Sequence, residues 1–96
     1  MINNKGFHLK VTGRVQGVGY RYYCRNVAGS MKLKGYVMNL PDGSVEIEVF
    51  GEDKKINEFI KEIRRLDMGF FVDEVQIENI PQDKKYHDFE IKFYSE

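Results

Sequence analysis

The sequence predicts an α+β fold in which two helices cover one face of an antiparallel sheet. Apolar and polar residues alternate in several short segments, as in half-buried strands. In two other segments apolar residues recur every three to four positions, as in amphipathic helices. The order is strand, helix, strand, strand, helix, strand, with a further strand at the end. At 96 residues, the chain is expected to form one domain over residues 1–96.

The first half is predicted to form a strand, a helix and a second strand. Phe7, Leu9 and Val11 alternate with polar residues and indicate the first strand. A glycine-containing turn then leads to a helix. Its apolar stripe comprises Tyr20, Tyr23, Cys24, Val27, Ala28 and Met31. This helix should end within residues 29–34, because a strand begins near Tyr36.

A hairpin turn is predicted over residues 40–44. Pro41 restricts φ, and the Asp42-Gly43 pair provides the positive φ that a tight reversal needs. The alternating residues 45–50 should form the strand that follows.

The second helix is expected to start at the acidic residues after Gly51, which suit a helix N-terminus. Its stripe comprises Ile56, Phe59, Ile60, Ile63 and Leu66. A strand is expected over residues 71–80, followed by a polar loop over 81–86. The alternation of Phe89, Ile91 and Phe93 predicts the last strand.

Charge is distributed unevenly along the chain. Residues 1–40 carry seven lysines and arginines and no acid, whereas residues 41–96 carry all fifteen acids against eight bases. This asymmetry favours an anion-binding region in the first half, unless the fold interleaves the two halves. The net charge of zero argues against broad nucleic-acid binding.

We expect a cytoplasmic protein with no membrane partner, no metal and no cofactor. The N-terminus lacks the apolar region of a secretory signal, and no apolar run approaches the roughly 18 residues of a membrane span. Cys24 is the single cysteine, which excludes a disulfide framework and a cysteine-based zinc cluster. Together with His8 and His87 it does not make a metal-binding set.

The segment 13–21 is the most informative motif. It reads Gly-Arg-Val-Gln-Gly-Val-Gly-Tyr-Arg and leads from a strand into a helix. Backbone N–H groups converge at such a helix start, and Arg21 adds a guanidinium that can bind two oxygens of a phosphate. The Walker ending and the dinucleotide-binding glycine spacing are both absent. The alternative is that the glycines only permit a tight connection.

This segment resembles a signature of the acylphosphatase family. So does the segment 35–46, which reads Gly-Tyr-Val-Met-Asn-Leu-Pro-Asp-Gly-Ser-Val-Glu. The separation of the two segments and the predicted elements also resemble the ferredoxin-like α/β sandwich of this family. The resemblance implies metal-independent hydrolysis of acyl phosphates to a carboxylate and inorganic phosphate. The implied partner is a small-molecule acyl phosphate, with inorganic phosphate as product or inhibitor, and the protein is expected to be a monomer.

The resemblance also implies roles for individual residues. The loop backbone and the Arg21 guanidinium would hold the phosphoryl group, and Asn39 would position the attacking water. The loop residues are Gln16, Gly17, Val18, Gly19, Tyr20 and Arg21. An acyl phosphate has a good leaving group, which is consistent with the lack of carboxylates in the first forty residues. Without the resemblance, Asn39 would be expected to bond the turn backbone.

Three positions depart from the usual family pattern. Tyr20 replaces a phenylalanine, and its hydroxyl needs a partner if it is buried. Met38 stands where a basic residue often precedes the asparagine. Lys32 replaces a glycine that would end the first helix in a left-handed conformation. Lys32 must adopt that conformation at a cost of about 1 kcal/mol, or the helix must end differently.

The same architecture also serves functions other than acyl phosphate hydrolysis. An RNA-recognition domain needs exposed aromatic and basic residues on its central strands, whereas the outward positions here include Glu46, Glu48 and Phe50. A second alternative, which the sequence leaves open, is a domain that binds an anion without catalysing its hydrolysis. A domain cut from a carbamoyl-transfer enzyme is less favoured, because 96 residues suit a freestanding chain.

Overall fold

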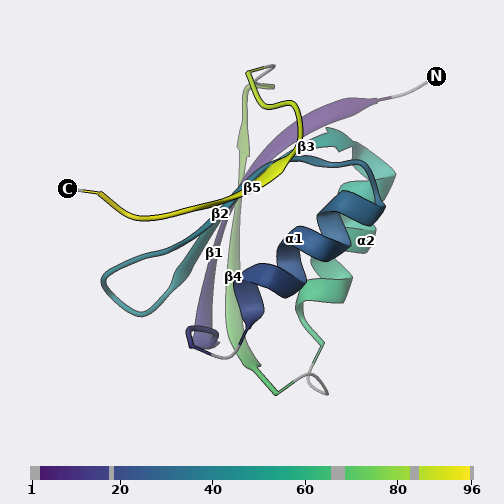
Figure 1. Cartoon of the computed structure of the whole chain (residues 1–96). Helices are drawn as coiled ribbons and strands as arrows, with labels where there is room; N and C mark the ends of the chain where they lie inside the picture. The colour runs from purple at the N-terminus through teal and green to yellow at the C-terminus, as the bar shows by residue number, and fades with distance from the viewer. Residues whose placement is uncertain (1–2, 18, 66–68, 83–84, 96) are drawn as a thin grey trace.

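The computed structural model describes residues 3–17, 19–65, 69–82 and 85–95. In this part of the chain, five strands form one sheet and two helices lie on one of its faces (Figure 1). The elements are β1 (Asn4–Arg14), α1 (Tyr20–Ser30), β2 (Lys34–Asn39), β3 (Val45–Glu52), α2 (Asp53–Ile63), β4 (Phe71–Ile80) and β5 (Phe89–Lys92). The predicted fold class and element order are confirmed. Leu66, predicted on the second helix, lies outside the described residues.

The sheet has the strand order β4-β1-β3-β2-β5. β1 pairs with β3 and β4, and β2 pairs with β3, all antiparallel. β5, however, runs parallel to β2, so the expectation of a wholly antiparallel sheet is wrong at this edge. The reason is topological: the chain leaves β4 at one edge, crosses the end of the sheet and enters β5 in the direction of β2.

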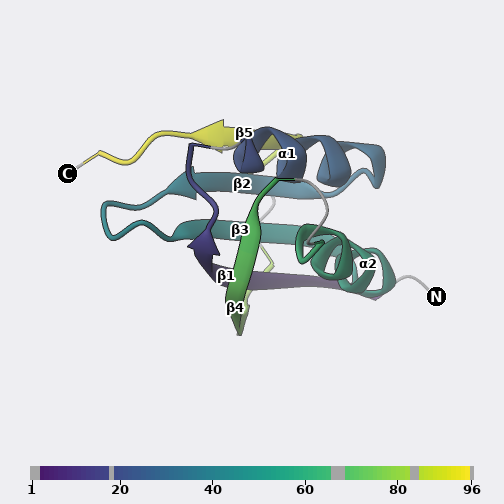
Figure 2. The same cartoon turned by 90° about the horizontal axis from the view of Figure 1, so that it is seen from below.

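The main core lies between the sheet and the helices. α1 packs over β2 and β5, and α2 packs over β3 (Figure 2). The fully buried side chains include Leu9, Val11, Cys24, Ala28, Val37, Ile47, Val49, Ile56, Phe59 and Ile63. The predicted strand and helix stripes therefore supply the core. Within the described residues, neither helix has the length and apolar character that crossing a membrane requires.

The sheet face away from the helices carries a second apolar cluster of Tyr36, Phe50 and Tyr86. Phe50 has an outward-facing strand position but is only 4% exposed. Its ring stacks on Tyr86, with the centroids 5.9 Å apart, and it also covers Gly6, where an added Cβ would lie 2.9 Å from the ring. Alternation on one strand could not show this burial, because Tyr86 comes from the segment before β5.

The last strand is shorter than predicted. β5 ends at Lys92, opposite Met38, and Phe93 lies outside the strand with 77% of its surface exposed. β2, the neighbour of β5, ends at Asn39, one residue after Met38. The described part of β2 therefore gives the chain after Lys92 no strand to continue pairing with. The inclusion of Phe93 in a strand was therefore wrong.

The end of α1 answers the question raised by Lys32. Lys32 adopts a φ of 58°, the left-handed conformation that glycine usually supplies. Its N–H donates to the Gly29 carbonyl at 3.1 Å, and the Leu33 N–H donates to the Ala28 carbonyl at 2.9 Å. This pair of bonds is a Schellman motif, and the buried Leu33 side chain seals it.

The replacement of Lys32 by glycine should raise the free energy of unfolding by about 1 kcal/mol, because glycine adopts this backbone conformation without steric penalty. Urea denaturation monitored by circular dichroism measures the change. Lys32→Ala is the control, since it removes the charge and keeps the Cβ. Equal stabilisation by both variants would contradict the backbone explanation.

Tyr20 joins the start of α1 to the end of α2. Its side chain is 1% exposed, and its hydroxyl donates to the Ile63 carbonyl at 2.8 Å. Its ring meets Phe70 edge to face at 4.7 Å. Burial raises the pKa of the Tyr20 hydroxyl well above its ordinary value, which keeps it a neutral donor. The buried hydroxyl thus has the partner that it needs.

Tyr20→Phe should lower the free energy of unfolding by about 1–2 kcal/mol, because it leaves a buried carbonyl without this donor. Tyr23→Phe provides the matched control. The Tyr23 hydroxyl lies 3.1 Å from both the Glu62 carbonyl and Glu62 Oε2, to which it can donate, but in a half-buried position that water can reach. Its loss should therefore cost less in the same urea titration. A Tyr20→Phe variant as stable as the parent chain would refute the importance of this bond.

Candidate functional site

The connection between β1 and α1 depends on two left-handed glycines. Gly17 has a φ of 73° and Gly19 a φ of 82°, and a Cβ at either position would meet no atom within 4 Å. The glycines are thus needed for their backbone conformation and not to avoid a clash. Gly19 caps α1 without a side-chain hydrogen bond, and the first turn of α1 contains no acid. The N–H groups of this turn have no acceptor within the helix, which makes them donors for an anion.

Gln16 joins this loop to the β2–β3 hairpin. Its side-chain amide donates to the Leu40 carbonyl at 2.9 Å and to the Ser44 carbonyl at 2.8 Å. These two carbonyls also close the hairpin turn, through Gly43 N–H to Leu40 and Leu40 N–H to Ser44. One side chain therefore sets the distance between the loop and the turn.

The hairpin turn has its own polar support. Asp42 accepts hydrogen bonds from the Ser44 hydroxyl and from the Ser44 backbone N–H at 2.9 Å. It also forms an ion pair with Lys10, at 3.0 Å between Nζ and Oδ2. The Ser44 bonds, together with Lys10, hold the pKa of the Asp42 carboxyl well below its usual range. The turn is thereby held in one conformation beside Asn39.

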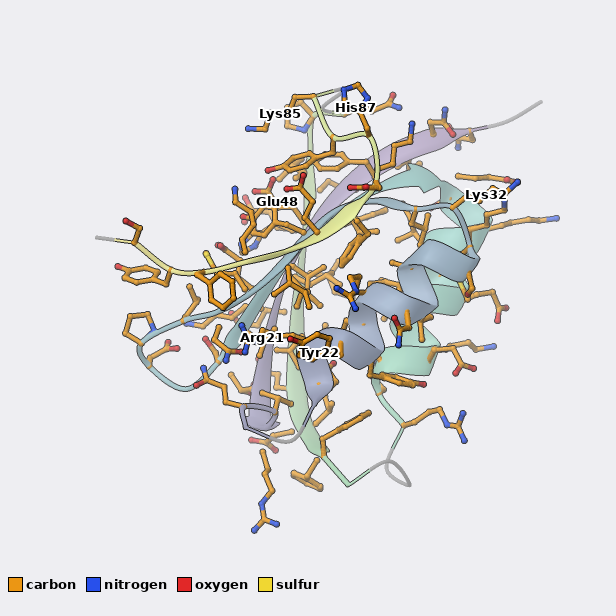
Figure 3. All side chains as sticks on the ribbon, in the orientation of Figure 1. Arg21, Tyr22, Lys32, Glu48, Lys85 and His87 are labelled. Carbon is orange, nitrogen blue, oxygen red and sulfur yellow. The ribbon has the colours of Figure 1, made fainter. Side chains whose placement is uncertain are left out.

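Arg21 and Asn39 line the same pocket, of about 340 Å³, although they lie on different elements. Arg21 is in the first turn of α1, on the side that faces the β2–β3 hairpin (Figure 3). Asn39 is the last residue of β2, opposite Val45. Leu40, Pro41, Lys92, Phe93 and Tyr94 complete the lining.

The Asn39 side chain has an oxygen available for a ligand. Oδ1 is buried, and no described residue donates a hydrogen bond to it. The simpler expectation was that Asn39 bonds the turn backbone. The Asn39 oxygen makes no such bond with the described residues. A buried acceptor without a donor costs about 1–3 kcal/mol, a cost that a water or ligand hydrogen bond would offset.

Part of the charge separation seen in the sequence is cancelled in space. Two ion pairs, Lys5 with Asp53 and Lys10 with Asp42, join the first half to the acidic second half, and His8 forms a hydrogen bond with Glu46 at 2.8 Å. The interleaved alternative thus applies to β1. Arg21, on α1, has no carboxylate partner among the described residues, and its guanidinium carbon lies 5.4 Å from the Phe93 ring centroid.

The structure places the expected site residues as follows. Gln16, Arg21 and Asn39 are brought to one end of the sheet by the loop and the hairpin. Tyr20 directs its side chain to α2 and can contribute only its backbone. Val18 lies outside the described residues. Among the residues described, no three His, Cys, Asp or Glu side chains gather as metal ligands.

Sequence reasoning missed the segment after β5. Phe93 and Tyr94 line the pocket, but strand alternation assigned Phe93 to the sheet. The available signal was a pair of aromatic residues near the chain end. That pair could not be linked to Arg21 without knowing that β5 lies beside β2.

Known proteins share both the sequence and the fold. The acylphosphatase family model matches residues 7–91. An acylphosphatase of Bacillus pumilus is 40% identical over 86 residues, which are 90% of this chain and 96% of that protein. The structure of a Coxiella burnetii acylphosphatase has a TM-score of 0.87 at 32% identity and covers 94% of each chain. Full-length HypF, solved with phosphate and nucleotide bound, matches 96% of this chain with 12% of its own length, at 35% identity and a TM-score of 0.86.

The match therefore spans the β1–α1 loop, the hairpin and both helices, and the neighbouring structures share the arrangement of two helices on a five-stranded sheet. The chain belongs to the acylphosphatase family.

Proposed function

We propose that this chain hydrolyses acyl phosphates to a carboxylate and inorganic phosphate at the pocket that Arg21 and Asn39 line. The N–H groups of residues 16–21 and the Arg21 guanidinium bind the phosphoryl group, and Asn39 positions the attacking water. No cofactor takes part. The proposal keeps the expected single domain, monomeric state and cytoplasmic location, which rest on the sequence alone.

One observation carries the proposal. Among the described residues, a guanidinium that has no ion pair and a buried amide oxygen that has no donor line one pocket. The first is suited to a phosphate and the second to a water proton. Family membership supports the same reaction.

The step needs no protein acid or base. The water oxygen attacks phosphorus, the bond from phosphorus to the acyl oxygen breaks, and its electron pair leaves on the carboxylate. The proton released by the water passes to a phosphate oxygen. A carboxylate with a pKa of about 4 leaves without protonation. In keeping with this, no Asp, Glu or His is among the described residues that line the pocket. Catalysis then depends on positioning and on charge stabilisation of the phosphoryl group.

The outer sheet face gives little support to RNA binding. Glu46 accepts hydrogen bonds from Tyr36 and His8, and Phe50 is buried beneath Tyr86. An exposed aromatic platform, as RNA-binding sheets require, is therefore not formed by these residues. The alternative function is phosphate binding without hydrolysis. The following experiment distinguishes it from acyl phosphate hydrolysis.

Arg21→Ala and Asn39→Ala should each lower kcat/KM for benzoyl phosphate by about 10²–10³-fold, as the loss of one well-placed donor or positioning group does. Release of benzoate is followed in EDTA. Arg25→Ala and Asn26→Ala are matched controls, because both residues are exposed on α1 and do not line the pocket. A phosphate monoester should not be hydrolysed, since its leaving group is poor.

An inactive parent chain that still binds inorganic phosphate would instead identify a binding domain. Activity that survives in both Arg21→Ala and Asn39→Ala would contradict the assigned site.

Gln16→Met should lower kcat about 10-fold or more while KM changes less, because a loose hairpin misplaces Asn39 relative to the phosphate. Methionine has similar length but cannot donate to the Leu40 and Ser44 carbonyls. The double variant with Asn39→Ala separates positioning from general damage. If Gln16 acts through Asn39, the second substitution costs little in the Asn39→Ala background. Full additivity would show that Gln16 acts in another way.

A further inference from the structure

The pocket extends beyond the residues that handle phosphate. Leu40 and Pro41 of the hairpin and Phe93 and Tyr94 after β5 also line it. These are large apolar or aromatic side chains. Phe93 is 77% exposed and Tyr94 is 48% exposed. Both follow directly after β5, whose first residue, Phe89, is buried in the core. Exposed aromatic surface around a pocket marks a place for an apolar ligand group.

The sheet topology brings this segment to the site. β5 runs parallel to β2 and ends at Lys92, opposite Met38, one residue before Asn39. The chain then continues beside the end of β2 and the hairpin (Figure 2). Phe93 and Tyr94 thus line one pocket with Asn39 and with the turn residues Leu40 and Pro41.

Phe93 also contacts the charged end of the pocket. The Arg21 guanidinium carbon lies 5.4 Å from the centre of its ring. A guanidinium that packs on an aromatic face keeps its N–H groups, which lie in its plane, available for oxygen ligands. Phosphate binding by Arg21 is therefore compatible with an aromatic group close beside it.

We propose that Phe93 and Tyr94, together with Leu40 and Pro41, form an acyl-binding subsite that favours aryl acyl phosphates over short ones. The inference rests on the proposed function. With the phosphoryl group at Arg21 and the water at Asn39, the acyl group extends toward these four side chains. A phenyl group is large enough to pack on them, whereas a methyl group leaves them exposed to water.

The test compares benzoyl phosphate with acetyl phosphate in the full chain. Phe93→Ala should lower kcat/KM for benzoyl phosphate about 10-fold and that for acetyl phosphate less than about 3-fold, as expected for a lost apolar pocket contact. Phe93→Leu should keep most of the preference, because it retains an apolar side chain. Phe71→Ala is the matched control, since Phe71 is 53% exposed on β4 at the opposite edge of the sheet.

A second measurement separates an acyl contact from support of Arg21. Competitive inhibition by inorganic phosphate should be unchanged in Phe93→Ala. Equal loss for both substrates, weaker phosphate inhibition, or no loss at all would overturn the subsite. A parent chain that hydrolyses neither substrate would instead overturn the proposed function, and the subsite with it.

Discussion

The sharp reversal between β1 and α1 is the constraint on which the rest of the site depends. Gly17 and Gly19 both adopt positive φ, and this brings the start of α1 directly after the end of β1. Any other residue would pay a conformational penalty at these points. The N–H groups of the first helical turn are thereby presented at the end of the sheet, where a phosphate could bind.

Hydrogen bonds from Gln16 and Tyr20 hold the two ends of this reversal in place. Gln16 holds the loop to the hairpin through two carbonyls, and Tyr20 holds the start of α1 to the Ile63 carbonyl at the end of α2. Arg21, the next residue, faces the pocket. The arginine is therefore placed by neighbours that are satisfied within the fold, so its guanidinium can be reserved for a ligand. Such a rigid surround is what catalysis by positioning requires.

The hairpin and the chain end contribute the rest of the pocket. Asp42 and Ser44 shape the turn, and Asn39 keeps a buried oxygen without a donor among the described residues. An unpaired buried acceptor lowers stability, and proteins tend to retain such groups where function needs them. The segment after β5 adds aromatic surface beside the apolar residues Leu40 and Pro41 of the turn.

The sequence by itself determined the element order, the core stripes and the glycine-containing loop before α1, because periodicity and glycine placement act over a few residues. Two motifs in a family pattern also pointed to Arg21 and Asn39, which the fold brings to one pocket. Only the tertiary structure decided that β5 is parallel to β2, that Phe50 is buried and that Phe93 reaches the pocket. These three facts depend on residues distant in the chain. Local patterns report which face of an element is apolar, but not which distant segment covers it.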